Sequence, residues 1–386
     1  MPASQIPNLL DSLRSGRGGT RGRGRGSRRG SGGSREGQDR IVQQTDCDAL
    51  GSRLSAVEMG YLIDPFIKNF VESPIDQRSP EINLGTYVRT TAIDRLVDKF
   101  LATDPDQPKQ IVSLGAGSDT RFFRILSTRQ SIPLVYHEID FPVNARQKVA
   151  AIKRSPVLSS VITSKLANPN ELSYSEDLRG LKSPIYNIHP LDLRSLVSSP
   201  TPSDSEPPLP TLPNLSPTTP TLILSECCLI YLSPDDADSV LDTITTKLIP
   251  APTPMSIILY EPFRPYDSFG KVMISNLGRR GIVLQTLKKY STLMRQRERL
   301  NRFSLADCQA AVDCQFVWDR WIGEEEKKAL WSGAKEGPLD GWEEWFILVA
   351  HYCVAWGYRD GEGDLFKTAW SDFPIQDPAS VVEKTE

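Results

Sequence analysis

The sequence predicts an α/β fold, a doubly wound and mostly parallel sheet with an antiparallel C-terminal edge and a helical cap. Two observations lead to this prediction. Short, continuously apolar runs alternate with segments in which apolar residues recur every three or four positions, as in parallel strands covered by helices on both faces. The run that ends at Leu114 is also followed by a Gly-x-Gly turn, Gly115 to Gly117, which often follows the first strand of such sheets.

Each element follows from the spacing of apolar residues. A surface helix is apolar at a spacing of three to four, whereas a strand buried on both faces is apolar throughout. In chain order, the expected elements are helix 87–101, strand 111–114, helix 122–126, strand 134–139, helix 143–152, strand 185–188, strand 221–225, helix 235–247 and strand 257–260.

The C-terminal third is expected to supply the edge and the cap. Residues 314–318 and 346–356 are further strand candidates, which would form an antiparallel hairpin at one edge. Helices within residues 264–305 would form the cap. The segment 278–302 is rich in Arg and Lys; it is either a solvated helix face or, beside an active site, a surface that attracts an acidic partner.

Composition divides the chain further. Residues 1–40 carry nine Arg against three acidic residues and consist largely of Arg, Gly and Ser from residue 14 onward, so a disordered tail is expected. Eight of the 21 residues from 200 to 220 are Pro, which predicts a surface loop, residues 198–220, inserted into one domain. The folded domain would then span residues 41–362, followed by a C-terminal tail, residues 363–386.

Composition also excludes several classes of protein. The six Cys form no C-x-x-C pair, so disulfide scaffolds and structural zinc are not expected. The three His lie outside the hydrolase and metalloprotease motifs. No secretory leader or apolar run long enough for a bilayer is apparent. We therefore expect a cytoplasmic protein, a monomer without a membrane segment or a bound metal, whose chemistry needs no histidine base.

The glycine turn is the main indication of a ligand. Gly115 and Gly117 would let the backbone approach a ligand closely, but Thr120 replaces the third glycine of the dinucleotide motif. Asp140, 23 residues after Gly117, ends the next strand and could accept hydrogen bonds from ribose hydroxyls. A nucleoside without phosphates, such as S-adenosylmethionine, fits this pattern. A tight turn in some other α/β protein remains the alternative.

Further carboxylates follow the next strands. Asp192, Glu226 and Glu261 come where these strands should end, and ligands in open α/β sheets bind at that edge. They could meet an adenine amino group, an ammonium or a sulfonium. Each could instead be a helix N-cap or a solvated acid.

Several motifs together resemble one family. They are residues 60–66 (GYLIDPF), 80–83 (PEIN), 114–120 (LGAGSDT), 138–142 (EIDFP) and 225–231 (SECCLIY). Between about residues 53 and 358 the chain resembles the leucine carboxyl methyltransferases. The resemblance implies that a methyl group passes from S-adenosylmethionine to the C-terminal leucine carboxylate of the type 2A protein phosphatase catalytic subunit, which would regulate holoenzyme assembly. The leader, the proline loop and residues 188–191 depart from the family pattern.

The resemblance also implies roles for individual residues. Arg53 and Arg89 would reach the carboxylate of the cofactor or of the substrate, and Gly115 and Gly117 would underlie the methionine part. Asp140 would hold the ribose, Asp192 and Leu193 would lie at the adenine, and Glu226 and Tyr231 would face the transfer site.

Little acid–base chemistry would be required. A C-terminal carboxylate, with a pKa of about 3.3–3.7, is already a nucleophile at neutral pH, so catalysis reduces to positioning. Arg89 and Tyr231 are the candidates for this role. A tight arginine clamp would stabilise the charged ground state, so we expect Arg89 to contact the acceptor off axis or to hold mainly the cofactor. Otherwise, Arg89 forms a helix ion pair and Tyr231 is a core aromatic.

Two other functions stay open. A relative could methylate another carboxylate, on a modified tRNA base or a small molecule. Alternatively, the protein could bind RNA weakly through residues 14–40, because Arg-Gly segments bind phosphates and stack on bases with little sequence preference.

Overall fold

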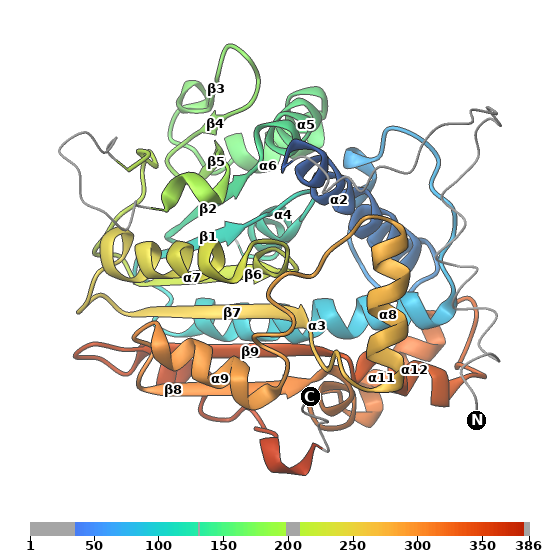
Figure 1. Ribbon diagram of the computed structural model, residues 1–386. Helices are drawn as coiled ribbons and strands as arrows, with labels where there is room; N and C mark the ends of the chain where they lie inside the picture. Colours follow the sequence, from blue (N-terminus) through green and yellow to red (C-terminus); the bar gives the residue numbers. More distant parts are fainter. Residues whose placement is uncertain (1–34, 130–131, 198–208, 382–386) are drawn as a thin grey trace, which may run out of the picture.

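A nine-stranded mixed sheet runs through the middle of the molecule, and helices cover both of its faces (Figure 1). The computed structural model describes residues 35–129, 132–197 and 209–381. The strand order is β3-β4-β5-β2-β1-β6-β7-β9-β8. The five strands from β5 to β7 are parallel, and the outer strands pair antiparallel. The predicted fold class is confirmed.

The five parallel strands are the five that the sequence predicts in its first 260 residues. They are β1 (Lys109–Leu114), β2 (Leu134–Asp140), β5 (Tyr186–Pro190), β6 (Thr221–Glu226) and β7 (Met255–Pro262). Every residue of β1 and β7 is buried. Strands covered on both faces have no solvated side, which explains their unbroken apolar runs.

Helices on the two faces enclose separate hydrophobic cores. One face carries α3 (Pro80–Ala102), α4 (Arg121–Thr128), α5 (Pro142–Arg154), α6 (Pro156–Thr163), α10 (Cys314–Phe316), α11 (Glu324–Gly333), α12 (Trp342–Val349) and α13 (Leu365–Trp370). The other carries α7 (Pro234–Thr243) and α9 (Leu293–Arg302). Successive residues of β1 alternate between the cores, Ile111 in the first and Val112 in the second. Within the described residues, no helix has the length and apolar character needed to span a membrane.

The strand order places a switch point at β1. This strand pairs with β2 on one side and β6 on the other, and Leu114 is in register with both Ile139 and Ser225. The residues that follow these strands therefore emerge next to one another. Crevices at such switch points are the usual ligand sites of open α/β sheets.

The antiparallel edge is present, but its strands lie elsewhere in the sequence than predicted. Residues 314–318 form α10 and the start of a π-helical segment, Val317–Trp321, and the strand before them is β8 (Cys308–Asp313). Within residues 346–356, α12 ends at Val349, and β9 (Tyr352–Arg359) lies between β7 and β8. Short apolar runs do not distinguish a buried helix from a strand. At the opposite edge, β3 (Ser173–Tyr174) and β4 (Leu181–Lys182) were not predicted.

The folded region extends beyond residues 41–362 at both ends. α2 (Arg35–Glu58), which the sequence did not predict, begins inside the expected tail of residues 1–40. Residues 1–34, and with them most of the proposed RNA-binding segment 14–40, lie outside the described residues. α13 lies in the expected C-terminal tail, 363–386, yet Phe366 is buried and stacks on Phe100 of α3 with ring centroids 4.9 Å apart. Aromatic burial therefore makes this segment part of the core.

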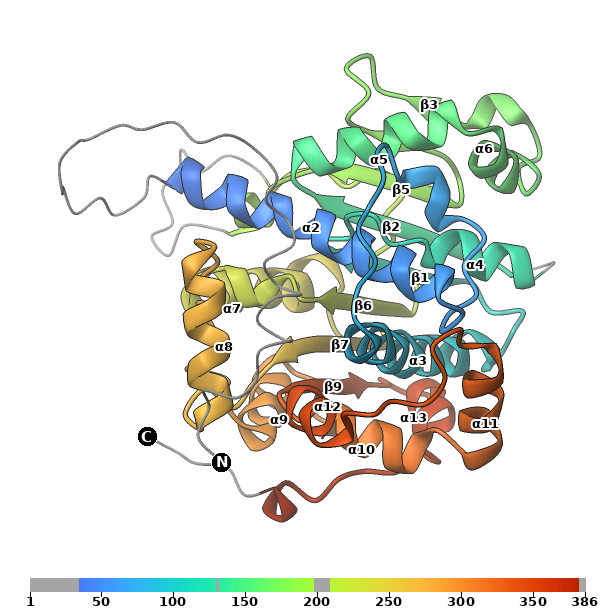
Figure 2. The same cartoon turned by 90° about the vertical axis from the view of Figure 1, so that its right-hand side faces the viewer.

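The expected cap and loop are each present in part. α8 (Ser268–Arg279) stands at the carboxyl ends of the parallel strands, opposite α2 (Figure 2). α9, also within residues 264–305, instead packs against β8 and β9. In the predicted loop, residues 198–208 lie outside the described residues, and 209–220 lead into β6 without helix or strand.

Two buried histidines join β2 to β5. Nδ1 of His137 lies 3.0 Å from Nε2 of His189, and the rings are stacked. Burial lowers the pKa of His137 to about 3 and that of His189 to about 4. Both rings are therefore neutral at physiological pH, which allows one ring to donate and the other to accept.

We expect the His137–His189 pair to make the fold sensitive to acid. The folded pKa values lie below about 6.5, the usual value for a histidine in an unfolded chain. Below that pH the unfolded chain therefore binds more protons than the folded protein. Each ring then lowers the free energy of unfolding by about 1.4 kcal/mol for each unit by which the pH falls. His189→Gln removes one titrating ring. In urea unfolding, the free energy of unfolding of the wild-type protein should fall by about 2 kcal/mol more than that of the variant between pH 7.5 and 5. Equal losses would contradict this expectation.

We expect α13 to contribute to stability like any core helix. Phe366→Ala removes a fully buried ring and should lower the free energy of unfolding by about 3–5 kcal/mol. Lys367→Ala, on the exposed side of the same helix, should change it by no more than about 0.5 kcal/mol. Chemical denaturation measures both, and equal stability of the two variants would show that residues 363–386 are a dispensable tail.

Candidate active site

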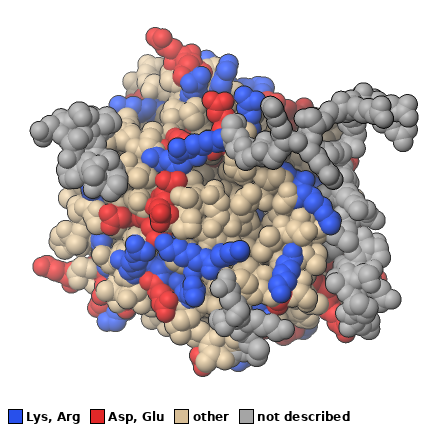
Figure 3. All heavy atoms as spheres, in the orientation of Figure 1, with Lys and Arg blue, Asp and Glu red and all other residues tan. Residues whose placement is uncertain are grey.

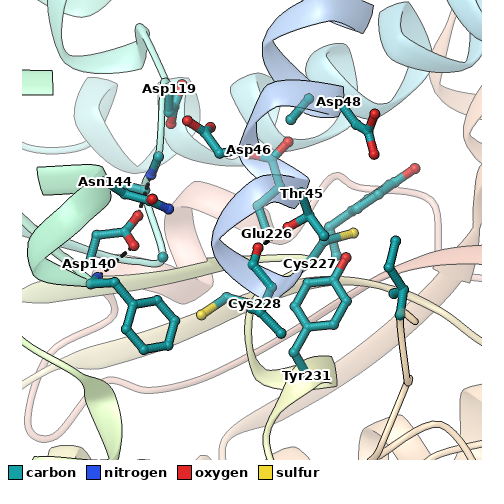
Figure 4. A pocket seen from close by; sticks show the side chains of 18 of the residues that line it. Thr45, Asp46, Asp48, Asp119, Asp140, Asn144, Glu226, Cys227, Cys228 and Tyr231 are labelled. Atoms are coloured by element: carbon teal, nitrogen blue, oxygen red, sulfur yellow. Dashed lines mark hydrogen bonds between the residues drawn. The ribbon is translucent and has the colours of Figure 1, made fainter. Parts of the chain in front are cut away.

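A cavity of about 570 Å³ opens at the switch point, between the strand ends and the helices α2 and α8 (Figure 4). All nine residues predicted for the site line this cavity: Arg53, Arg89, Gly115, Gly117, Asp140, Asp192, Leu193, Glu226 and Tyr231. They come from residues far apart in the chain, which the sheet topology brings together. Their individual roles stay predictions.

The glycine turn needs glycine for two reasons. Gly115 and Gly117 have φ values of +61° and +45°, which residues with a Cβ rarely adopt. A Cβ on Gly115 would lie 2.6 Å from Sγ of Cys228, and one on Gly117 would lie 2.2 Å from Oδ1 of Asp46 in α2. Glycine at these two positions therefore leaves room for Cys228 beside the turn and for the close approach of α2.

Asp140 is held by the turn. One carboxylate oxygen accepts from the N–H of Gly117 at 2.6 Å and the other from the N–H of Phe141 at 2.7 Å. Burial, assisted by the charge of Asp46, raises the pKa of Asp140 to about 6 although both N–H groups oppose the shift. No ion pair to Asp140 is present in the part of the chain that the structure describes. Its remaining acceptor capacity is available to a neutral donor such as a hydroxyl.

Asp192 is more firmly engaged than predicted. Its carboxylate accepts from Nε of Arg194 at 2.9 and 3.0 Å, and it also caps the short helix Leu193–Leu196. The N-cap alternative is therefore realised, although the residue still lines the cavity. Arg194 binds Asp39 of α2 as well, at 2.7 Å. This bridge fastens α2 across one end of the cavity.

Glu226 joins two arginines where β6 ends. It pairs with Arg89 through a short contact and faces Nη2 of Arg121 at 3.4 Å. Burial alone would raise the pKa of Glu226, but the two guanidinium groups hold it below its usual value. The Arg89 guanidinium also lies 4.8 Å above the ring of Tyr260. Arg89 of α3 thus forms an ion pair with a strand residue, and both partners line the cavity.

Arg53, from α2, and Tyr231, from the segment after β6, both line the cavity. Arg53 donates to Asp64 and to Thr90, each at 3.3 Å. Tyr231 points toward Thr45 of α2 (Figure 4), and burial raises the pKa of its hydroxyl above the usual value. Tyr231 is therefore protonated and can donate a hydrogen bond.

Apart from Arg53, sequence reasoning missed the contribution of α2. Its residues Gln38, Asp39, Val42, Thr45, Asp46, Ala49 and Arg53 line the cavity at helical spacing. This mostly polar stripe was the available signal, but a search for apolar periodicity passes over it. Asp46 is central, because it accepts from the N–H and the hydroxyl of Ser118, both at 2.8 Å.

Glu261 does not belong to the site. It was expected at the same sheet edge as Glu226, but it does not line the cavity and instead pairs with Arg299 at 3.0 Å, both side chains being fully buried. It thereby fastens α9 to β7. A carboxylate at a strand end can serve the adjoining helix as easily as a ligand.

The charges on the wall favour a cationic ligand. Eight carboxylates and five arginines line the cavity, and Asp46 and Asp140 are among the acids without an ion pair to a described residue. Among the residues that the structure describes, no histidine lies on the wall. The cavity is thus equipped to bind and orient charged groups.

Comparison with known proteins identifies the family. Residues 41–245 match the model of the leucine carboxyl methyltransferases. Leucine carboxyl methyltransferase 1 of Aspergillus fumigatus is 48% identical, covering 94% of this chain and 96% of the relative. The Emericella nidulans protein of that name is 47% identical, covering 97% and 99%. A homolog from Arabidopsis thaliana is 33% identical, covering 83% and 90%.

Solved methyltransferases are similar only at a distance. A putative methyltransferase from Thermobifida fusca shares 13% identity and a TM-score of 0.42, covering 72% of this chain and 83% of that one. The assignment therefore depends on the sequence relatives, which match almost throughout. On that ground the chain, a methyltransferase, belongs to the leucine carboxyl methyltransferase family.

Proposed function

We propose that this protein transfers the methyl group of S-adenosylmethionine to a C-terminal leucine carboxylate, and that its acceptor is the catalytic subunit of type 2A protein phosphatase. Membership of the family supports carboxyl methylation. The observation that carries the proposal is one cavity lined both by the Gly115–Gly117 turn with Asp140 and by Arg89, Glu226 and Tyr231.

The residues present fit S-adenosylmethionine. Asp140 offers a carboxylate without an ion-pair partner among the described residues, suited to ribose hydroxyls, and the turn presents no side chain at Gly115 and Gly117. The excess of carboxylates suits a ligand that carries ammonium and sulfonium charges. When bound, S-adenosylmethionine supplies a methyl group on an electrophilic sulfonium. Asp192 and Leu193 would border the adenine.

The apolar part of the cavity lining suits a leucine side chain. Leu277, Ile282, Leu348 and Val349 all line the cavity, as does Tyr352. Arg89 and the hydroxyl of Tyr231 can each donate to an acceptor oxygen. Because the acceptor is ionised at neutral pH, orientation is the main task of these residues.

The pairing of Arg89 with Glu226 limits how tightly Arg89 binds. Methyl transfer turns a carboxylate anion into a neutral ester, so a contact that stabilises the anion most strongly would slow the reaction. Glu226 neutralises part of the Arg89 charge and also fixes its direction. Arg89 can therefore orient the acceptor without holding its charge too tightly.

Methyl transfer to the phosphatase tests the function. Labelled methyl groups should pass from S-adenosylmethionine to the intact catalytic subunit, should be released as methanol in alkali, and should not appear on a subunit that lacks its terminal leucine. Arg89→Ala should lower kcat/KM about 10- to 100-fold, as expected for a lost charge-assisted hydrogen bond. Label in an alkali-stable form, or on both subunits alike, would overturn the proposal.

Cofactor binding should weaken in acid. The pKa of Asp140 is about 6, so below that value its carboxylate becomes protonated and loses acceptor strength. Calorimetric affinity for S-adenosylmethionine should fall about tenfold from pH 7 to pH 5. Asp140→Asn should bind weakly at both pH values, so its affinity should not show this dependence. A variant that follows the wild-type pH profile would exclude Asp140 as its origin.

A further inference from the structure

His351 links α8 to the segment after α12. Its Nδ1 lies 2.7 Å from the carbonyl oxygen of Ile347, and its Nε2 lies 2.9 Å from both carboxylate oxygens of Asp267. The ring is buried, with 3% of the side chain exposed, and it packs 4.5 Å from the ring of Phe269. Both nitrogens of His351 therefore have an oxygen partner.

Both partners of His351 are acceptors. A carbonyl oxygen and an ionised carboxylate can only accept, so each contact is a hydrogen bond when the ring nitrogen in it carries hydrogen. Burial would raise the pKa of Asp267, but the N–H of Gly270 and His351 hold it below its usual value. Arg264 lies 3.3 Å from the same carboxylate. Asp267 is therefore ionised at neutral pH and joins His351, Arg264 and the first turn of α8.

This pair joins two elements that contribute to the cavity wall. Asp267 caps α8 by accepting from the N–H of Gly270 at 2.8 Å. The other end of α8 carries Leu277 and Arg280, which line the cavity, and Arg280 also pairs with Asp48 of α2. Tyr352, next to His351, lines the cavity as well and stacks on Tyr260 with centroids 5.7 Å apart. The pair therefore ties α8 to the segment that carries Tyr352.

We propose that His351, bound to Asp267, is a positioning residue for methyl transfer that holds α8 against the cavity. The proposal rests on the proposed function for its effect on transfer, but not for its effect on the protein itself. Without this contact the N-terminal end of α8 is held less firmly, and Leu277 on the same helix no longer has a fixed position on the cavity wall.

Kinetics and hydrogen exchange test the positioning role. We compare His351→Gln and Asp267→Asn with Lys328→Gln, which removes an exposed charge of α11. At pH 6.5, both pair variants should raise the KM for the acceptor about tenfold and leave kcat and calorimetric cofactor affinity near wild type. An unchanged KM in either pair variant would overturn the proposal.

A readout that needs no activity separates this proposal from the proposed function. At one pH, amide exchange in residues 268–279 should be about tenfold faster in His351→Gln and Asp267→Asn than in Lys328→Gln. Faster exchange in the two pair variants, together with no methyl transfer by the wild type, would contradict the proposed function but support the role of His351 in holding α8. Unchanged exchange in the pair variants would overturn that role, whatever the activity.

Discussion

A buried ion-pair network around Arg121 supports the site. Arg121, with 1% of its side chain exposed, contacts Asp94 of α3 at 2.8 Å, Asp119 of the glycine turn, and Glu226 of β6 at 3.4 Å. Unpaired, any of these charges would be costly to bury. Because each is satisfied only when the three segments lie together, the network specifies one arrangement of α3, the turn and β6. Arg89, held by Glu226, takes its direction from this arrangement.

The opposite wall is held in a different way. From Arg35 to Leu50, the helix α2 has no fully buried residue, so it gains little from apolar packing. Polar contacts fasten it instead, through Asp39 to Arg194, Asp46 to Ser118 and Asp48 to Arg280. Figure 3 shows basic and acidic side chains together on the face that includes α8 and α9. One wall is thus part of the core, while the other is attached through charges near the surface.

This contrast explains what could be predicted from the sequence. The parallel strands and the residues after them were predictable because burial on both faces leaves an unbroken apolar run, and parallel strands end at one edge. The pocket residues Gly115, Asp140 and Glu226 follow from that rule. α2 could not be predicted in this way, because the face that it turns to the cavity is polar. The helix at residues 314–318 could not be predicted either, because a short apolar run suits a buried helix as well as a strand. Asp192 and Glu261 show that strand-end acids can serve helix caps and ion pairs.

The placement of the histidines agrees with the chemistry of the cavity. His137 and His189 are neutral inside the sheet, and His351 is buried against Asp267, outside the cavity lining. The wall itself pairs charges, as in Arg89 with Glu226 and Arg194 with Asp192. A reaction in which a cation and an anion become neutral needs groups that orient charge without stabilising it strongly. Paired arginines meet this requirement, whereas an unpaired arginine would favour the ionised acceptor over the transition state.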